Sequence, residues 1–176
     1  MRAVAIDHFG GPEALSVHTL PVPEVGPGEV LVRVATAGVG EWDPFEREGG
    51  YAEMLGITPT FPYVLGSEGS GTVVAVGDGV DRFAVGDEAY AAGFLNPKGG
   101  FYAEYAAVDA ELASPVPAGL SGEQAGVMSG VGVTAVRGLD GHARTVTRST
   151  YSGHQSAAHP YPNHRTPPTP PGVIVG

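Results

Sequence analysis

The sequence predicts a mainly β protein with short helices, built as a small barrel or sandwich, and three observations support this class. Glycine and proline contribute 28 and 16 of the 176 residues, well above their usual shares of about 7% and about 5%. Short apolar segments alternate with glycine-containing turns over residues 1–108. A helical pattern appears only after these segments. Short strands joined by glycine-rich turns are typical of barrels and sandwiches.

The first half of the chain contains three predicted strands. Residues 1–6 form the first strand, and a Phe-Gly-Gly-Pro turn follows it at 9–12. Residues 15–20 alternate apolar and polar side chains, which predicts a half-buried strand. Residues 21–28 are a Pro/Gly connection. Residues 29–35 are the clearest strand because they are rich in β-branched side chains.

The second half continues the sheet and ends in a helix. Residues 42–55 carry an acidic face with scattered aromatics, which predicts a short helix and a loop. Ser121 and Gln124 have the spacing of a capping box, and residues 125–139 are small and apolar enough for a packed helix. Between these helical segments, three further strands are predicted at 71–77, 87–92 and 101–108.

The composition of the chain changes after Asp140. All 19 acidic residues precede residue 141, whereas residues 141–176 hold four of the six histidines and six of the prolines. The sequence therefore predicts a domain over 1–140, which ends in a linking helix, and a different tail over 141–176. Two explanations of the tail stay open: a Pro-rich, weakly basic disordered segment, or codons translated out of the frame that continued the domain.

Charge and cysteine content exclude several classes of function. The formal net charge of −10 argues against nucleic acid or an anionic membrane surface as the main partner. Because the chain has neither a long apolar run nor a signal-peptide core, we expect a soluble, cytoplasmic protein. It also has no cysteine, which excludes disulfides and thiolate zinc sites.

Five motifs follow one another along residues 1–140. They are Phe9-Gly-Gly-Pro-Glu-Ala-Leu15, Gly26-Pro-Gly-Glu-Val-Leu-Val-Arg-Val34, Leu65-Gly-Ser-Glu-Gly-Ser-Gly-Thr-Val73, Val85-Gly-Asp87 and Gly100-Phe-Tyr-Ala-Glu-Tyr105. Each alone is a weak turn-strand signal, but their order and spacing resemble the catalytic domain of zinc-free medium-chain dehydrogenases/reductases of the quinone-oxidoreductase type. The resemblance implies a GroES-like partly open barrel. No complete Rossmann domain is expected, because no strand and Gly-rich turn follow residue 140.

The resemblance also implies a zinc-free site. Zinc-containing members of the family place a cysteine ligand at the position of Gly40 and a histidine ligand at the position of Ser67. Glycine offers no donor and a serine hydroxyl is a poor zinc ligand. The remaining carboxylates, Asp43 and Glu68, would make a weak zinc site by themselves. We therefore expect no metal in this domain.

Chemistry without a Lewis acid favours a particular class of substrate. Hydride addition to a simple carbonyl leaves an alkoxide that needs strong stabilisation. In a quinone or an α,β-unsaturated carbonyl, conjugation spreads the developing charge, so correct placement against a nicotinamide does most of the work. The chemistry of hydride addition and the resemblance both favour NADPH-dependent reduction of a small-molecule quinone or enone.

The resemblance assigns the substrate cleft to the loop after the third strand. It implies that Gly40, Trp42, Asp43 and Phe45 line the cleft, with Trp42 and Phe45 as an aromatic wall against a flat substrate. It also suggests Tyr51 as a catalytic residue whose hydroxyl meets a quinone oxygen. The alternatives are loop packing for the two aromatics and a surface or core-edge role for Tyr51. Many relatives carry Asn at position 40, which weakens a polar contact there.

Residues 130–135 satisfy G-x-G-x-x-A but do not form a dinucleotide fingerprint. No apolar strand precedes them and no acidic residue lies about 20 positions later to bind a ribose. The resemblance instead implies a helix that approaches the nicotinamide, with Thr134 and Gly132 at the cofactor edge. Packing of the helix through its small residues is the alternative.

Two functions therefore compete. The first is the N-terminal part of an NADPH-dependent oxidoreductase, with weak or no NADPH binding by this chain alone. The second is a truncated, non-catalytic GroES-like binding or oligomerising module. In either case, an uncovered apolar face on helix 121–139 predicts self-association. The histidines at 154, 159 and 164 do not share a helical face, because positions five apart lie about 140° apart, so we expect no metal there.

Overall fold

The computed structural model describes residues 1–139. The chain divides into two compact units, Met1–Arg137 and Gly138–Gly176, and the first of these is described below. The predicted tail over 141–176 and its histidines lie outside the described residues.

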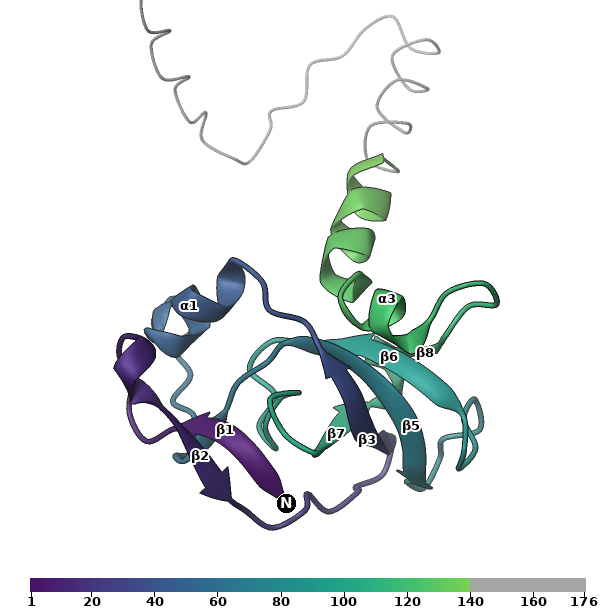
Figure 1. Cartoon of the computed structure of the whole chain (residues 1–176), viewed down its shortest axis with the longest axis horizontal. Coiled ribbons are helices and arrows are strands. Elements are labelled where there is room, and N and C mark those ends of the chain that lie inside the picture. Colours follow the sequence, from purple (N-terminus) through teal and green to yellow (C-terminus); the bar gives the residue numbers. More distant parts are fainter. Residues whose placement is uncertain (140–176) are drawn as a thin grey trace, which may run out of the picture. The chain divides into compact units, whose positions relative to one another are not determined.

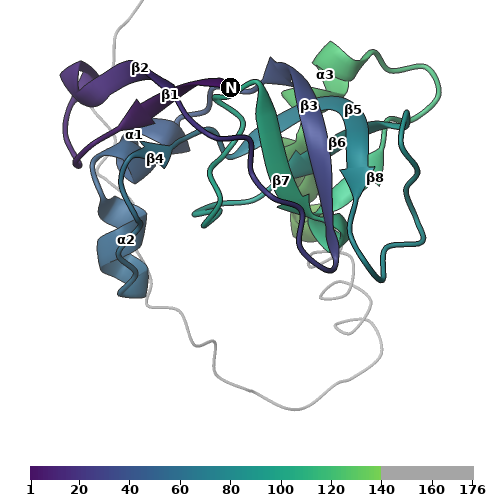
Figure 2. The same ribbon diagram turned by 90° about the horizontal axis from the view of Figure 1, so that it is seen from below.

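A five-stranded antiparallel sheet forms the larger part of the first unit, with strand order β7-β3-β5-β6-β8. The sheet curls into a half-barrel (Figure 2). This confirms the mainly β class and the partly open barrel predicted from the sequence. The strands are β3 (Glu29–Ala37), β5 (Glu68–Val76), β6 (Glu88–Ala92), β7 (Tyr105–Asp109) and β8 (Ala113–Pro115).

The interior of this half-barrel is apolar. Its buried side chains come mostly from alternate strand positions, as expected where only one face of a strand is covered. Loops contribute two phenylalanines. The largest members of the cluster are Val30, Val32, Val73, Phe83, Phe101 and Val108.

A three-stranded sheet lies beside the half-barrel, with strand order β2-β1-β4 (Figure 1). Its strands are β1 (Arg2–Ile6), β2 (Leu15–Thr19) and β4 (Tyr63–Val64). A second buried cluster packs against it and includes Ile6, Tyr63 and Leu65. The strands predicted at 1–6 and 15–20 are confirmed, whereas β4 and β8 are too short to leave a readable period in the sequence.

Two short helices, α1 (Trp42–Arg47) and α2 (Gly50–Leu55), replace the predicted helix and loop over residues 42–55. They are separate because Gly49 between them adopts φ +90°, a left-handed conformation that a helix cannot continue through. Two 3₁₀ turns, η1 (Pro12–Ala14) and η2 (Ala110–Leu112), complete the connections.

The predicted capping box is confirmed at the start of α3 (Gly122–Gly126), where Ser121 and Gln124 exchange side-chain and backbone hydrogen bonds. The predicted helix over 125–139 is interrupted: residues 127–128 form a turn and helix resumes over 129–139. Before the turn, Gly126 lies so close to β5 that a Cβ there would sit 2.8 Å from the Ser70 hydroxyl. Within residues 1–139, no helix is long and apolar enough to cross a membrane.

The strand predicted over 101–108 begins only at Tyr105. The preceding residues bond to a neighbouring loop instead, because the Phe101 and Tyr102 amides donate to the carbonyls of Gly66 and Leu65. This pairing brings the segment that precedes β7 against the segment that precedes β5. The loops around α1 meet both segments, and the candidate site lies there.

Candidate active site

Four aromatic rings from three segments form a continuous cluster, which we call the aromatic wall: Trp42, Phe45, Tyr51 and Phe94. Phe45 and Tyr51 pack edge to face with ring centroids 4.8 Å apart. Phe94 lies 5.3 Å from Tyr51 and 6.0 Å from Trp42. Edge-to-face pairs at these distances are favourable beyond the area they bury. The structure therefore brings the three sequence-predicted aromatics together and adds a fourth.

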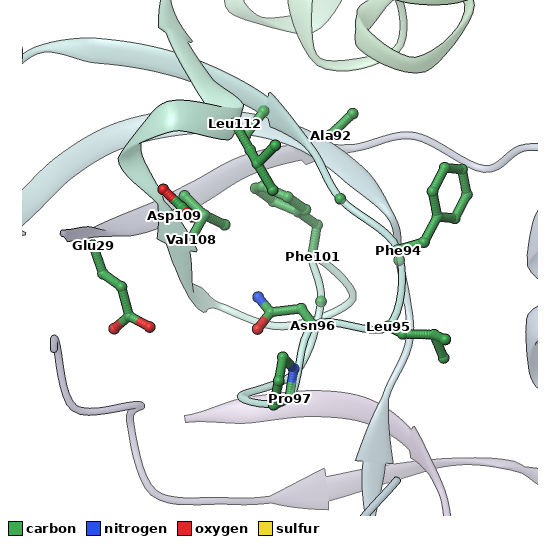
Figure 3. Close-up of a pocket in the computed structure, with 14 residues that line it drawn as sticks. Glu29, Ala92, Phe94, Leu95, Asn96, Pro97, Phe101, Val108, Asp109 and Leu112 are labelled. Atoms are coloured by element: carbon green, nitrogen blue, oxygen red, sulfur yellow. The ribbon is translucent and has the colours of Figure 1, made fainter. Parts of the chain in front are cut away.

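Phe94 reaches the wall from the loop that follows β6. Its side chain and that of Leu95 lie on one side of this loop, away from Glu29 and Asp109 on the other side (Figure 3). The loop, Phe94 and Leu95 included, borders a cavity of about 310 Å³ that Phe101, Val108 and Leu112 also help to line. Phe94 thus belongs both to the aromatic wall and to the lining of this cavity.

Gly40 provides room for the Trp42 indole. A Cβ at position 40 would lie 2.3 Å from Cε2 of Trp42, much closer than real Cβ atoms approach a neighbour. The ring of Trp42 therefore occupies the space that a side chain at position 40 would need.

Asp43 is buried beneath the wall, at 5% exposure. Its Oδ2 accepts a hydrogen bond from the Gly40 amide at 2.5 Å, which closes the turn at the start of α1. Its Oδ1 is buried without a partner among the described residues. The carboxylate predicted to line the cleft thus supports the loop from inside, and its role toward a substrate stays a prediction.

Glu46 is a second buried carboxylate on α1, at 2% exposure. Its Oε1 accepts hydrogen bonds from the Tyr63 hydroxyl at 2.7 Å and from the Leu95 amide at 3.2 Å. Burial raises the pKa of Glu46, and the Asp43 charge raises it further against the effect of these two bonds. Burial and the Glu46 carboxylate likewise raise the pKa of Tyr63.

Glu68 is a third buried carboxylate, at the first position of β5. Its Oε2 accepts from the Gly130 amide at 2.8 Å and lies 3.0 Å from the Ser129 hydroxyl. The same hydroxyl lies 3.1 Å from the Ala91 carbonyl, so its one proton serves one acceptor at a time. Glu68 thereby ties the start of helix 129–139 to the sheet.

The interior next to the wall is consequently acidic and rich in unpaired polar atoms. Four buried side-chain atoms lack a hydrogen-bond partner among the described residues, and all belong to this region: Trp42 Nε1, Asp43 Oδ1, Glu46 Oε2 and Ser67 Oγ. Burial and the nearby carboxylates of Asp43, Glu46 and Glu68 raise the pKa of Tyr102. Buried unpaired polar groups are rare in protein interiors and often mark functional regions.

Comparison with known proteins identifies the family to which this fold belongs. Residues 26–118 match the alcohol dehydrogenase GroES-like domain. The chain belongs to this GroES-like family. A quinone oxidoreductase of Rattus norvegicus is 34% identical over 145 residues, which cover 82% of this chain and 42% of that protein. A quinone oxidoreductase of Pseudomonas aeruginosa is 40% identical over 127 residues, covering 72% and 36%.

A solved structure supports the same assignment. The Escherichia coli quinone oxidoreductase, whose structure contains NADPH, superposes with a TM-score of 0.63 at 28% identity, over 72% of this chain and 36% of that one. The GroES-like chain thus spans about two fifths of the length of the curated relatives it matches. Membership of this family relates the chain to oxidoreductases.

The two positions that the resemblance links to zinc ligands lie in two different connecting segments. Gly40 precedes α1, and Ser67 directly precedes β5 with its hydroxyl buried. Across residues 1–139, no three His, Cys, Asp or Glu side chains gather so that they would hold a metal ion.

The two predicted cofactor residues both lie on helix 129–139 of the GroES-like chain. Thr134 is exposed, and its hydroxyl donates to the Gly130 carbonyl at 3.0 Å, one turn earlier. Gly132 faces open space, since a Cβ there would meet nothing within 4 Å. Gly130 connects this helix to the wall, because a Cβ at position 130 would lie 3.3 Å from the Trp42 ring. The helix that carries both residues therefore begins beside the aromatic wall.

Two site residues were missed in the sequence. Phe94 follows β6 with no pattern that links it to residues 40 positions earlier, so only the fold shows the contact. Glu46 left a signal: it lies three positions after Asp43, on the same face of a helix. The sequence showed an acidic face over residues 42–55, and the structure buries Asp43 and Glu46 from it.

Proposed function

We propose that this chain is the substrate side of an NADPH-dependent oxidoreductase that reduces quinones or other conjugated carbonyls by hydride transfer without zinc. The aromatic wall is the observation that supports this proposal most. A flat conjugated ring stacks well on aromatic edges and faces. The similarity to quinone oxidoreductases favours the same substrate class.

The acidic groups near the wall favour a neutral substrate. Asp43, Glu46 and Glu68 are buried near it and no described cation is paired with them. An anionic ligand would find no charge partner there, and burial of an unpaired charge is costly. A neutral quinone or enone avoids this cost when it binds. During reduction, the hydroxyl of Tyr51 would donate to the oxygen on which negative charge develops.

The described residues fit one edge of a nicotinamide cofactor. NADPH, when bound, would supply the hydride. Thr134 and Gly132 would lie at its nicotinamide edge, since their helix begins next to Trp42 and Gly132 leaves open space. Arg137 is the one arginine or lysine within residues 129–139, so this helix itself supplies a single cation for the phosphates. We therefore expect weak or absent NADPH binding by the 176-residue chain, and the choice of NADPH over NADH stays a proposal.

A binding and turnover experiment on the 176-residue chain tests the proposal. Trp42 is the only tryptophan, so a neutral naphthoquinone that binds the wall should quench its fluorescence in a saturable manner. The same sample, mixed with NADPH, should show little or no NADPH oxidation. Quenching that rises linearly without saturation would contradict binding at the wall, and rapid turnover would show that the chain is itself a competent enzyme.

Tyr51→Phe and Phe45→Ala separate the two roles in the wall. Phe45→Ala removes an edge-to-face partner and should weaken quinone binding about tenfold, since an aromatic contact with its area contributes on the order of 1.4 kcal/mol. Tyr51→Phe keeps the ring and should weaken binding less. If both variants bind the quinone with the same affinity as the unaltered chain, the aromatic wall does not contribute to quinone binding.

The competing non-catalytic function has one observation in its favour. Large apolar side chains on helix 129–139 and in the turn before it are 48–60% exposed. They are Val127, Met128, Val131, Val133 and Val136. We propose that these exposed apolar side chains support self-association, because apolar surface left in contact with water favours association.

Sedimentation over a wide range of concentrations tests self-association. The chain should form dimers or larger species as its concentration rises, and Val131→Glu should shift this equilibrium toward monomer. Val17→Glu is a matched control, because Val17 is equally apolar and 74% exposed but lies on β2. A monomer at all concentrations would rule out the oligomerising module.

A further inference from the structure

Phe94 is the one member of the aromatic wall that comes from neither α1 nor α2. It is 48% exposed, so packing against Trp42 and Tyr51 covers only part of its ring. A half-exposed ring at the tip of a loop needs a fixed backbone beneath it if it is to keep one position. The next residue in the chain provides that backbone.

Leu95 adopts φ +53° and is the only described residue other than glycine with a positive φ. This left-handed conformation is unfavourable for a residue with a Cβ and persists only where the surroundings hold it. Two contacts hold it here. The Leu95 side chain packs against the cluster of Ile6, Tyr63 and Leu65, and the Leu95 amide donates to Glu46 Oε1.

Glu46 is placed to hold this loop rather than to meet a ligand. It is almost completely buried, and the same oxygen that accepts from Leu95 also accepts from the Tyr63 hydroxyl in the small sheet. Glu46 is also one residue from Phe45, so α1 carries a member of the wall on its exposed side and the loop's anchor on its buried side.

We propose that Glu46 is a positioning residue that sets the place of Phe94 in the aromatic wall, by fixing Leu95 in its left-handed conformation. The consequence of this role for substrate binding rests on the proposed function. If Phe94 is displaced, the aromatic wall presents a different surface to a conjugated ring. The position of Phe94 itself is a property of the chain without substrate.

The single tryptophan makes the position of Phe94 measurable without any substrate. Phe94→Ala removes the ring next to Trp42 and should shift Trp42 emission to longer wavelength and increase its quenching by acrylamide. Glu46→Ala removes the acceptor for the Leu95 amide and should reproduce both changes while Phe94 is still present. Glu46→Gln retains a side-chain oxygen that accepts both hydrogen bonds, so it should restore the spectrum of the unaltered chain at neutral pH.

Two results would overturn the proposal. One is a Glu46→Ala variant with native far-UV circular dichroism and an unchanged Trp42 spectrum. The other, which needs no variant, is rapid hydrogen exchange of the Leu95 amide in the unaltered chain, since a buried hydrogen bond to Glu46 predicts strong protection. The second measurement decides the matter if Glu46→Ala fails to fold.

These outcomes are separable from those of the proposed function. If the chain fails to bind a quinone but Glu46→Ala changes the Trp42 spectrum, Glu46 positions the loop and the substrate assignment is wrong. If quinone binding is saturable and the Trp42 spectrum is insensitive to Glu46, the wall binds its substrate without this anchor.

Discussion

The half-barrel and helix α1 bury opposite kinds of side chain. In the half-barrel, Val30, Val32 and Val73 point inward from their strands and are almost completely buried. In α1, Asp43 and Glu46 are buried while Phe45 is 47% exposed. The half-barrel follows the usual rule that removal of apolar surface from water determines the buried face. In α1, hydrogen bonds from loop amides and from the Tyr63 hydroxyl on β4 determine it.

The two regions contribute differently to the stability of the fold. The apolar interior of the half-barrel supplies the free energy of folding, so its residues tolerate little change in volume. The region of α1 contains buried carboxylates with unpaired oxygens, which cost stability. Sites that bind ligands commonly carry such costs, while a rigid scaffold elsewhere compensates for them.

The largest expected loss of stability comes from a substitution that disrupts the backbone pairing in the half-barrel. A Cβ at Gly71 would lie 2.0 Å from the Arg33 carbonyl oxygen of the neighbouring strand. Gly71→Ala should therefore force β3 and β5 apart and cost about 3 kcal/mol or more, the scale of the most damaging single substitutions. Thermal unfolding followed by circular dichroism measures it.

Gly132→Ala is the matched control for that substitution. The chemical change is the same, but position 132 is helical and open, and alanine there should stabilise the chain by about 0.5–1 kcal/mol. Similar losses in both variants would mean that close packing between β3 and β5 is not what excludes a side chain at position 71.

A smaller effect compares the exposed wall on α1 with the buried cluster against the three-stranded sheet. Leu65→Ala removes a side chain that is 2% exposed and should cost about 2–5 kcal/mol. Phe45→Ala removes a larger side chain from the wall, yet it should cost less because half of that ring is in contact with water. Urea unfolding of both variants gives the two losses directly. A greater loss for Phe45→Ala would show that the wall contributes to the core.

The smallest expected effect concerns the pH dependence of stability. Burial raises the pKa of Glu46 above 4.5, so the folded chain holds this proton more tightly than the unfolded chain does. Between pH 4.5 and the raised pKa, the folded state binds more protons, and its stability falls as the pH rises through this window. Below pH 4.5 Glu46 is protonated in both states, and the free-energy cost of burying its charge disappears.

Glu46→Gln cannot titrate and should lack this fall. At pH 7 the variant should unfold at a higher temperature than the unaltered chain, by about 2–4 °C per kcal/mol of penalty removed. At pH 4 the two unfolding temperatures should converge. Because all other ionisable groups are shared, the difference isolates Glu46, and parallel curves from pH 4 to pH 8 would contradict the raised pKa.

Sequence patterns predicted the half-barrel well because its strands are amphipathic or apolar over several residues. The β-branched residues in 29–35 and the turn glycines around 71–77 define these elements locally. The wall was predicted in part: Trp42, Phe45 and Tyr51 lie within ten residues of one another, and a resemblance to a family linked them. Phe94 and the left-handed Leu95 depend on contacts across the fold, which no local pattern contains.

Glu68 also gives the chain a mechanical property. One of its carboxylate oxygens accepts from the Gly130 amide, and the neighbouring Ser129 hydroxyl donates either to the same oxygen or to the Ala91 carbonyl. A force that pulls helix 129–139 away from the sheet would load the bonds of both residues at once instead of opening them one after the other. In a single-molecule pulling experiment, Glu68 would act as a clamp, and the barrel would resist until the clamp releases.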